Sequence, residues 1–597
     1  MFKATKGEEN AESKDFYQNL KEMFASIANR LHISDQTFLI VLAVFVGIGA
    51  GFAAIGFRML ISMFNDLFFG NAKNVLSFLG DFYVILVPAV GGLLVGPIIY
   101  FFAREAKGHG VPEVMAAVAL KGGRIRPRVV LVKAFASAIS IGSGGSVGRE
   151  GPIVQIGSAL GSTVGQIFKM SDQRIRDLVA AGAAGGIAAT FNAPIAGVIF
   201  ALEVIIGQFT TKTFSLIVIS SVTASVIGRT FAGNAPAFIV PEYAMHHWGE
   251  LFLYVILGIL AGIFGIVYIK VLYKFEDFFD SMVVIPEYLR PVVGGLAVGL
   301  MGYFYYQIFG VGYETIESAL RAELLLGLML TLLVLKLIAT SITIGSGGSG
   351  GVFAPGLYMG AMLGGSFGVI VNMLFPGMTA SYGAYAVVGM GAVFAGSAKA
   401  PITAILILFE MTNDYRIILP LMIAVVISTF TANGLFKETI YTVKLARKGL
   451  KIKGGKQIDV MEGIKVQDVM MDHLDTISVD HTVDEVAGML STSRHHGFPI
   501  LDKEGRLAGI VTYQDVKEAL LEDKQNAPVI QIATTDVIKA LPAENLNEVL
   551  ARMAKRGIGR VPVVHPDSPD RLIGIITRSD IISAYNREVM KRAQENS

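Results

Sequence analysis

Apolar runs of about twenty residues recur between Ile33 and Leu445, and they constrain the fold of this chain more than any other feature. A helix needs about 20 apolar residues to cross the hydrocarbon core of a bilayer. Runs of this kind lie near residues 37–66, 82–103, 213–232, 250–275, 290–309, 324–344 and 417–436. The sequence therefore predicts an all-α polytopic domain that crosses a cell membrane, most simply the plasma membrane, several times.

Charged residues are scarce only in this first part of the chain. They make up 16% of the 597 residues, and the mean hydropathy is +0.58, whereas soluble proteins carry about 25% charged residues. We expect a cytoplasmic segment, a membrane domain, a linker and two soluble domains, at residues 1–34, 35–445, 446–465, 466–521 and 528–586. The basic stretch Lys444–Lys456 predicts a cytoplasmic C-terminus, and the polar first thirty residues predict a cytoplasmic N-terminus.

The membrane domain contains an internal duplication. The stretch Lys133–Ser146 recurs as Lys336–Ser349, and the stretch Ala193–Glu203 recurs as Ala400–Glu410. The repeats are expected at about 35–232 and 250–445, and transport proteins often arrange such repeats in inverted orientation. Short or Gly- and Pro-broken apolar segments lie near 109–120, 150–167, 192–206, 353–373 and 401–411. Irregular backbone is tolerated at membrane depth only inside protein or beside water, so these broken, re-entrant segments predict a binding site.

Glycine-rich loops precede two of the broken segments. Residues Gly142–Pro152 and Gly345–Pro355 each join an apolar helix to a second helix. Glycines allow backbone N–H groups to point inward and form an anion nest, and the following helix N-terminus adds a positive dipole end. Weak binding of a small anion at such a point suits permeation, because the ion must also leave.

An ionisable pair, Arg149-Glu150, lies within the first loop. Ionisable residues inside membranes are functional candidates. Glu150 would compete with an anion for the site, so that one carboxylate serves as gate and as proton acceptor. The structural alternative is an internal salt bridge that only holds the loop.

These motifs resemble those of the CLC family of chloride channels and chloride/proton antiporters. The resemblance is carried by Gly-Arg-Glu-Gly-Pro at 148–152, Phe-Asn-Ala-Pro-Ile-Ala-Gly at 191–197 and Gly-Gly-Val-Phe-Ala-Pro at 350–355. It implies a homodimer with one anion pathway in each subunit, and Glu150 as the gating residue. It also implies an anion site formed by His109, Gly110, Arg149, Glu150, Gly151, Val352, Phe353, Ala354 and Tyr441.

Two positions depart from the family pattern. His109, in Gly-His-Gly-Val-Pro, replaces a serine that contacts the central ion in the family. Its imidazole could donate a hydrogen bond to an anion, or it could merely face a water-filled vestibule. Whether the protein prefers chloride or nitrate therefore stays open. Val204 replaces an internal proton-transfer glutamate of the antiporters. The expected proton pathway contains Glu150 and Glu203, although Glu203 recurs as Glu410 and suits a capping role. Val204 favours a passive or weakly coupled channel, with a proton-coupled antiporter as the alternative.

The soluble part contains a second repeat. Each copy has an apolar strand with an internal proline and then Gly-Ile-Val/Ile-Thr-x-x-Asp, ending at Asp515 and Asp580. These α/β modules resemble tandem CBS domains. The resemblance implies ATP, ADP or AMP as an optional ligand, with contacts from Thr512, Asp515, Thr577 and Asp580; many CBS pairs bind nothing and act in dimerisation.

Other classes of function have weak support. The G-x-S-x-G pattern around Ser146 is duplicated around Ser349, which does not suit a single nucleophile of an enzyme. A P-loop is absent from the sequence, and a CBS-containing divalent-cation transporter would need acidic clusters in the membrane. No nucleic-acid partner is expected at a net charge of +2. No required cofactor is expected either. The histidine pairs 246–247 and 495–496 are interpreted as surface residues, with no metal site.

Overall fold

A computed structural model describes residues 35–71, 77–234, 236–238, 240–241, 243, 247–447, 450, 452–453, 456–457, 464–472, 474–493 and 497–594. The expected N-terminal segment 1–34 and His246, His495 and His496 lie outside the described residues. The chain divides into two compact units, Met1–Lys456 and Gln457–Ser597. Each unit is described by itself.

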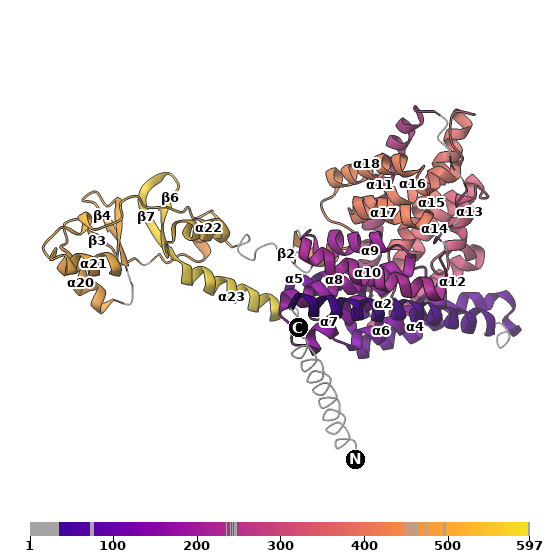
Figure 1. The fold of residues 1–597 in the computed structure, drawn as a ribbon, viewed down its shortest axis with the longest axis horizontal. Coiled ribbons are helices and arrows are strands. Elements are labelled where there is room, and N and C mark those ends of the chain that lie inside the picture. The colour runs from indigo at the N-terminus through magenta and orange to yellow at the C-terminus, as the bar shows by residue number, and fades with distance from the viewer. Residues whose placement is uncertain are drawn as a thin grey trace, which may run out of the picture. The chain divides into compact units, whose positions relative to one another are not determined.

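The first unit is a bundle of helices with several short irregular turns between them (Figure 1). The helices of its first half are α2 (Asp35–Asn65), α4 (Tyr83–Pro97), α5 (Val111–Leu120), α6 (Arg128–Gly142), α7 (Glu150–Ile167), α8 (Asp172–Phe191), α9 (Pro194–Phe200) and α10 (Thr211–Ala232). The helices of its second half are α11 (Glu250–Asp280), α12 (Arg290–Phe304), α13 (Tyr313–Leu320), α14 (Leu326–Gly345), α15 (Phe353–Leu374), α16 (Tyr382–Ala398), α17 (Pro401–Thr412), α18 (Ile418–Leu435) and α19 (Thr442–Arg447). The short 3₁₀ and π turns are η1 (Asp66–Asn71), η2 (Ser77–Phe82), η3 (Ile98–Phe102), η4 (Arg104–Ala106), η5 (Ala201–Ile206), η6 (Glu287–Leu289) and η7 (Tyr306–Ile308).

Seven helices of the described residues are long and apolar enough to span a membrane. Two of the segment predictions were wrong. The segment 290–309 is not one long helix, because α12 stops at Phe304 and Tyr305 leaves the helical conformation before η7. The segment 353–373 is not broken, because its glycines lie within one continuous helix, α15, of 22 residues.

In each half of the unit, glycines allow two neighbouring helices to pack closely, and the helix pair is the equivalent one in both halves. Gly157 of α7 packs against the backbone of Gly182 in α8, and Gly360 of α15 packs against the backbone of Gly389 in α16. A Cβ at any of these positions would collide with a carbonyl oxygen of the facing helix. Small residues at membrane helix interfaces permit such close approach. The duplicated sequence thus forms duplicated packing.

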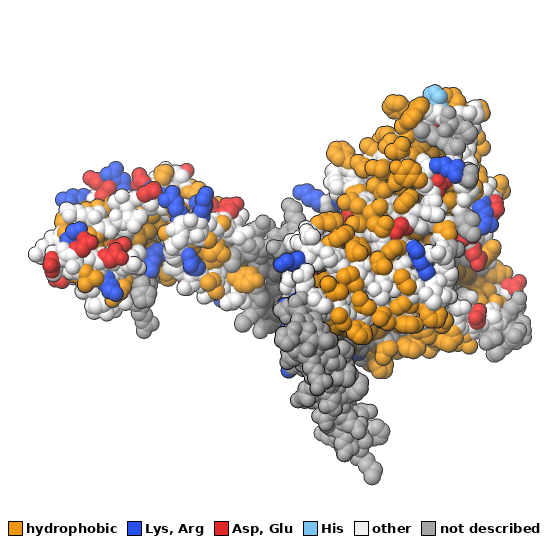
Figure 2. Space-filling view, in the orientation of Figure 1, with side chains coloured by type: hydrophobic (Ala, Val, Ile, Leu, Met, Phe, Trp, Pro, Cys, Tyr) orange, Lys and Arg blue, Asp and Glu red, His pale blue; other side chains and the backbone are white. Residues whose placement is uncertain are grey.

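Apolar side chains cover much of the visible surface of the first unit (Figure 2). Examples of large exposed apolar residues are Phe52 at 52% on α2 and Phe252 at 76% on α11. A soluble domain rarely exposes a continuous apolar surface of this kind, whereas a bilayer solvates it. The protein is therefore an integral, multi-pass membrane protein.

The second unit consists of two α/β modules. In the first, β3 (Ile477–Ser478) pairs in parallel with β4 (Gly497–Leu501), which pairs antiparallel with β5 (Leu507–Thr512). In the second, β6 (Arg560–His565) pairs antiparallel with β7 (Ser568–Thr577). The other elements of this unit are η9 (Val466–Asp468), α20 (Val483–Thr492), α21 (Tyr513–Leu521), η10 (Val529–Gln531), α22 (Leu546–Arg556) and α23 (Arg578–Gln594). The short strand β1 (Ile452–Lys453) belongs to the first unit, and β2 (Lys456–Gln457) contains the boundary between the units in the sequence.

Candidate anion site

The two glycine-rich loops meet in the interior of the first unit. Gly148 and Gly351 exchange backbone hydrogen bonds of 2.8 and 2.6 Å, and Gly108 is bridged to Ser349. These contacts place the N-terminal ends of α5, α7 and α15 beside one another. Helix N-termini carry unpaired N–H groups and positive dipole ends. The arrangement can therefore stabilise a small anion without a full positive charge.

Glu150 is the first residue of α7, and its side chain occupies this meeting point. It is 1% exposed. Its Oε2 atom accepts a hydrogen bond of 3.3 Å from the backbone N–H of Ala354 in α15, and its Oε1 atom accepts one of 2.8 Å from the hydroxyl of Tyr313. The carboxylate thus uses a backbone donor of the kind that an anion would use.

Tyr313 had not been identified from the sequence. It begins α13 outside both duplicated blocks, and nothing in the residues around it pointed to an anion site. Only the folded chain brings it to Glu150.

The glycines beside Glu150 are required by close packing. A Cβ at Gly148 would collide with Oε2 of Glu150, and a Cβ at Gly151 would collide with the carbonyl oxygen of His109. Gly110 has a φ of +83°, which disfavours any other residue. The glycine pattern therefore shapes the space around the carboxylate.

His109 and Tyr441 lie close together in the interior of the first unit. Both are 2% exposed, and their ring centroids are 6.0 Å apart. The hydroxyl of Tyr273 lies 3.5 Å from Nε2 of His109, and Nδ1 of His109 has no hydrogen-bond partner among the described residues. A buried ring nitrogen without a partner is suited to contact an anion, water or proton.

Two buried lysines brace the site from equivalent positions in the repeats. Lys133 donates to the carbonyl oxygens of Ala106 and Gly108 at 3.0 and 2.7 Å. Lys336 donates to those of Ile308 and Gly310 at 3.0 and 2.8 Å. Both side chains are fully buried. No role was assigned to these lysines from the sequence. The recurrence of a lysine at the same place in both copies of an apolar repeat is the signal that could have indicated one.

Serines of the glycine-rich loops donate hydrogen bonds to the same two segments that accept hydrogen bonds from the lysines. Ser349 of the second repeat donates to the carbonyl oxygen of Ala106 at 2.9 Å. Ser146 of the first repeat donates to the carbonyl oxygen of Ile308 at 2.7 Å. The hydroxyl groups are therefore engaged in holding the loops together, which is a structural use for residues that matched the nucleophile pattern.

Glu203 and Glu410 bind each other's repeat. Glu203 accepts hydrogen bonds from the backbone N–H groups of Ile402 and Thr403, at the start of α17, at 3.2 and 2.8 Å. Glu410 accepts from those of Ile195 and Ala196, at the start of α9, at 3.0 and 2.7 Å. Each carboxylate thus caps a helix of the other repeat.

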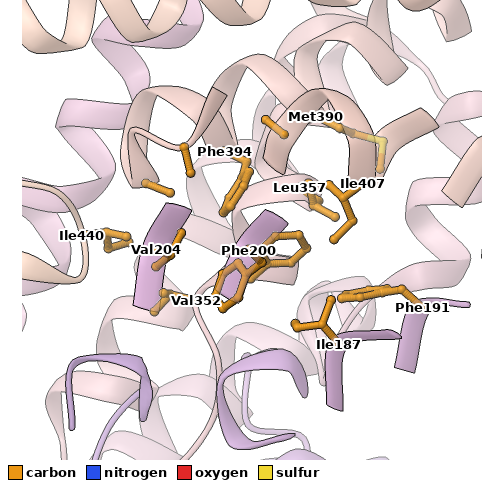
Figure 3. Close-up of a cluster of buried hydrophobic side chains, with 14 of the residues drawn as sticks. Ile187, Phe191, Phe200, Val204, Val352, Leu357, Met390, Phe394, Ile407 and Ile440 are labelled. Atoms are coloured by element: carbon orange, nitrogen blue, oxygen red, sulfur yellow. The ribbon is translucent and has the colours of Figure 1, made fainter. Parts of the chain in front are cut away.

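Val204 lies in an apolar cluster. Figure 3 labels it near Phe200, Val352 and Ile440, within a cluster of buried hydrophobic side chains. The turn η5 carries both Glu203 and Val204. At the position where antiporters of the resembled family have a proton-transfer glutamate, this chain therefore has no titratable group.

In the second unit, the Thr-x-x-Asp motifs cap helices. The carboxylate of Asp515 accepts from the N–H and hydroxyl of Thr512, both at 2.7 Å, at the start of α21. Asp580 binds Thr577 in the same way at the start of α23. Capping boxes of this kind stabilise helices without any ligand.

The side chain of Arg560 lies against Gly497. A Cβ atom added to Gly497 would collide with Nη1 of Arg560 and would lie 3.1 Å from Cα of Thr512, so the guanidinium group is close to Thr512. Burial lowers the pKa of the Arg560 guanidinium.

Comparison with known proteins agrees with this geometry. A family model described as voltage gated chloride channel matches residues 91–433, and a CBS domain model matches residues 466–522 and 529–587. The chain belongs to the CLC family. In this CLC protein the matched region contains the loops, both lysines and the Glu203–Glu410 caps.

Individual relatives extend the comparison. A ClcB-like protein of Ralstonia nicotianae, named as a chloride channel protein, is 37% identical over 61% of this chain and 85% of its own length. The H(+)/Cl(−) exchange transporter ClcA of Vibrio parahaemolyticus is 32% identical over 71% of this chain and 92% of its own length. The crystal structure of a slow cyanobacterial Cl⁻/H⁺ antiporter superposes with a TM-score of 0.65 at 27% identity, covering 70% of this chain and 98% of that one. These relatives are named as transport proteins, and none of these three names describes an enzyme.

Proposed function

We propose that this protein transports chloride across a membrane in exchange for protons. The observation that carries the proposal is the position of Glu150. Its carboxylate lies between the backbone N–H of Ala354 and the hydroxyl of Tyr313, at the meeting point of the two glycine-rich loops. A carboxylate that occupies an anion's donors is a competitor that must move before the anion can bind.

The chemistry of exchange follows from this competition. Proton uptake removes the negative charge of Glu150 and with it most of its attraction to the N–H group and the helix N-termini. The side chain can then leave, and chloride takes its place. Deprotonation reverses the exchange. We assign the anion site to backbone and side-chain groups of His109, Gly110, Arg149, Glu150, Gly151, Val352, Phe353, Ala354 and Tyr441.

The exchanger takes precedence over the channel that the sequence favoured. That preference rested on Val204, which does lie in an apolar cluster. The relatives named as exchangers support the alternative instead. Since residue 204 cannot carry a proton, the proposed route to Glu150 passes through other groups or water.

A proton-flux measurement tests the proposal. Purified protein is reconstituted into vesicles with a chloride gradient and no pH gradient. We expect chloride movement to drive protons in the opposite direction and so build up a pH difference across the membrane, in fixed proportion to chloride. Chloride flux without proton movement would restore the channel interpretation, and absence of both would reject chloride transport.

Several properties of the assembly belong to the same proposal. We place both termini in the cytoplasm, keep the domain limits at 35–445, 466–521 and 528–586, and propose a homodimer with one pathway in each subunit. Exposed apolar side chains on α10 and α18, such as Val226 and Phe430, support a membrane-embedded partner or lipid contact.

We also propose nucleotide regulation through the CBS pair. Half-buried Arg560 provides a positive charge beside Thr512, and a phosphate group would pair with it. Thr512, Asp515, Thr577 and Asp580 are the remaining contacts in this proposal. Titration of the full chain with ATP, ADP and AMP, compared with the variant Arg560→Gln, tests it; equal binding by both proteins would contradict it.

A further inference from the structure

A cavity of about 200 Å³ lies beside the gate. Its walls come from α2, the start of α7 and the C-terminal ends of α8 and α10, and it is lined by three arginines, Arg58, Arg149 and Arg229. The remaining lining residues are apolar, small or uncharged. Among the described residues that line the cavity there is no carboxylate to balance the three positive charges.

Two of the guanidinium groups are held by the cavity wall. Arg58 donates from Nη2 to the carbonyl oxygen of Thr190 at 3.2 Å. Arg229 donates from Nε to the side-chain oxygen of Asn192 at 2.6 Å. A guanidinium has five N–H donors, so each group keeps further donors for a ligand.

The third guanidinium connects the cavity to the gate. Arg149 lies with its guanidinium carbon 4.9 Å from the ring centroid of Tyr313, and Tyr313 is the residue that donates to Glu150. Its Nε atom is buried and has no hydrogen-bond partner within the described part of the chain. A buried charged donor without an acceptor is costly unless a ligand or water satisfies it.

Charge and size indicate the kind of ligand. Three guanidinium groups line one cavity, and bringing like charges together is unfavourable unless an anion lies between them. The planar fork of arginine matches oxyanions with two oxygens facing it. The cavity volume is several times the ~30 Å³ that one water occupies in the liquid, which leaves room for a tetrahedral oxyanion.

We propose that this arginine cavity binds a divalent tetrahedral oxyanion, such as sulfate or hydrogen phosphate, and that the bound anion slows chloride transport. A bound dianion neutralises the positive field that attracts chloride to this mouth of the pathway. It also attracts the guanidinium of Arg149, which packs on the Tyr313 ring. With both termini in the cytoplasm, α2 runs outward and the cavity faces the outer side. The effect on transport rests on the proposed function, whereas the binding itself does not.

Calorimetry tests the binding. Sodium sulfate is titrated into the purified full-length protein in detergent, with gluconate as the only other anion. We expect the wild type to bind sulfate, and Arg58→Gln and Arg229→Gln each to bind at least tenfold more weakly. Arg321→Gln, an exposed arginine that pairs with Glu317, is the matched control and should bind like the wild type.

Gel filtration checks that each variant is folded. Arg58→Lys keeps the positive charge and should bind sulfate more tightly than Arg58→Gln. Equal sulfate binding by the wild type and both glutamine variants would overturn the site. A wild type that binds no sulfate would overturn it as well.

Flux measurements test the regulation. Chloride efflux from vesicles is measured with increasing external sulfate, balanced by gluconate to constant ionic strength. We expect inhibition in the wild type and Arg321→Gln, and a half-inhibiting concentration at least tenfold higher in Arg58→Gln and Arg229→Gln. Inhibition of the same strength in all four proteins would overturn the regulatory role.

Vesicle composition separates a free oxyanion from a lipid phosphate. Sulfate should inhibit equally in vesicles of phosphatidylcholine alone and in vesicles containing phosphatidylglycerol. Inhibition that disappears when phosphatidylglycerol is present would overturn the assignment to a free oxyanion. If the wild type carries no chloride at all, the proposed transport function fails, and calorimetry still decides whether the cavity binds sulfate.

Discussion

The hydroxyl of Tyr313 donates a hydrogen bond of 2.8 Å to Oε1 of Glu150. This bond connects the second repeat to the proposed gate of the first. It holds the carboxylate in place together with the N–H of Ala354, and it is the contact most directly accessible to mutation, since the backbone donor cannot be removed.

Replacing Tyr313 by Phe should speed chloride transport. A hydrogen bond to a charged group contributes about 1.5–3 kcal/mol, so its loss should make the Glu150 side chain leave its position about ten to a hundred times more readily. We expect chloride efflux at neutral pH to rise about three- to tenfold. Tyr306→Phe, at a tyrosine that is 71% exposed, is the control. An unchanged rate in Tyr313→Phe would show that the bond does not limit gating.

Glu150→Gln should separate chloride movement from proton movement. The amide cannot exchange a proton at ordinary pH, and it lacks the charge that competes with chloride. Chloride efflux should therefore become independent of pH, and chloride-driven proton transport should disappear. Glu314→Gln, an exposed neighbour of Tyr313 on α13, should keep both properties. Proton pumping by Glu150→Gln would remove this residue from the proton pathway.

Glu203→Gln tests the second residue of the expected proton pathway. The carboxylate of Glu203 receives N–H donors of α17 and the hydroxyl of Thr403, and an amide oxygen can still accept from that helix. If capping is its role, the ratio of protons to chloride stays that of the wild type. Glu410→Gln, the equivalent change in the other repeat, should behave alike. A loss of coupling confined to Glu203→Gln would place this residue on the proton pathway.

His109→Ser should alter anion preference. His109 is buried beside Tyr441 with a ring nitrogen that has no partner in the described residues, and serine restores the residue that the family pattern has there. We expect the ratio of chloride to nitrate flux to change at least twofold. The exposed His247 changed to Ser serves as the control. Identical ratios would mean that His109 makes no selective contact with the ion.

Lys336→Met should destabilise the membrane unit. Lys336 makes two hydrogen bonds to buried carbonyl oxygens of Ile308 and Gly310, just before Tyr313. Methionine fills similar space but leaves both carbonyl groups without this donor, which should cost about 3 kcal/mol. Thermal unfolding in detergent should show a clearly lower apparent Tm, while Lys274→Met on the exposed side of α11 should show little change. Equal stabilities would exclude the bracing role.

Much of the fold could be predicted from residue patterns because the signals are local. Apolar length identified most of the membrane helices, and strand–turn–helix periodicity identified the two α/β modules. The two errors, at 290–309 and 353–373, have different reasons. At 290–309 apolar composition predicted one long helix, although α12 ends at Phe304. At 353–373 the glycines of α15 were interpreted as interruptions, whereas within a continuous helix they let a neighbouring helix approach.

The place where the two glycine-rich loops meet was predictable from the duplicated sequence, and its anion-binding role stays a prediction. Glycine spacing and the Arg149-Glu150 pair predicted an anion nest with a competing carboxylate, since ionisable residues inside a membrane are functional candidates. Tyr313 and the arginine cavity were not predictable in this way. Arg58, Arg149 and Arg229 are separated by long stretches of chain and share no motif.

The sequence by itself determined that this protein crosses a membrane, that its membrane domain is duplicated, and that glycine-rich loops surround one glutamate. These properties follow from apolar length, repeated identities and residue chemistry. Only the tertiary structure decided which groups hold that glutamate, because Tyr313 and Ala354 reach it from the other repeat. Only folding, too, brought three distant arginines around one cavity, since the convergence of charges depends on how α2, α7, α8 and α10 pack and not on their order in the chain.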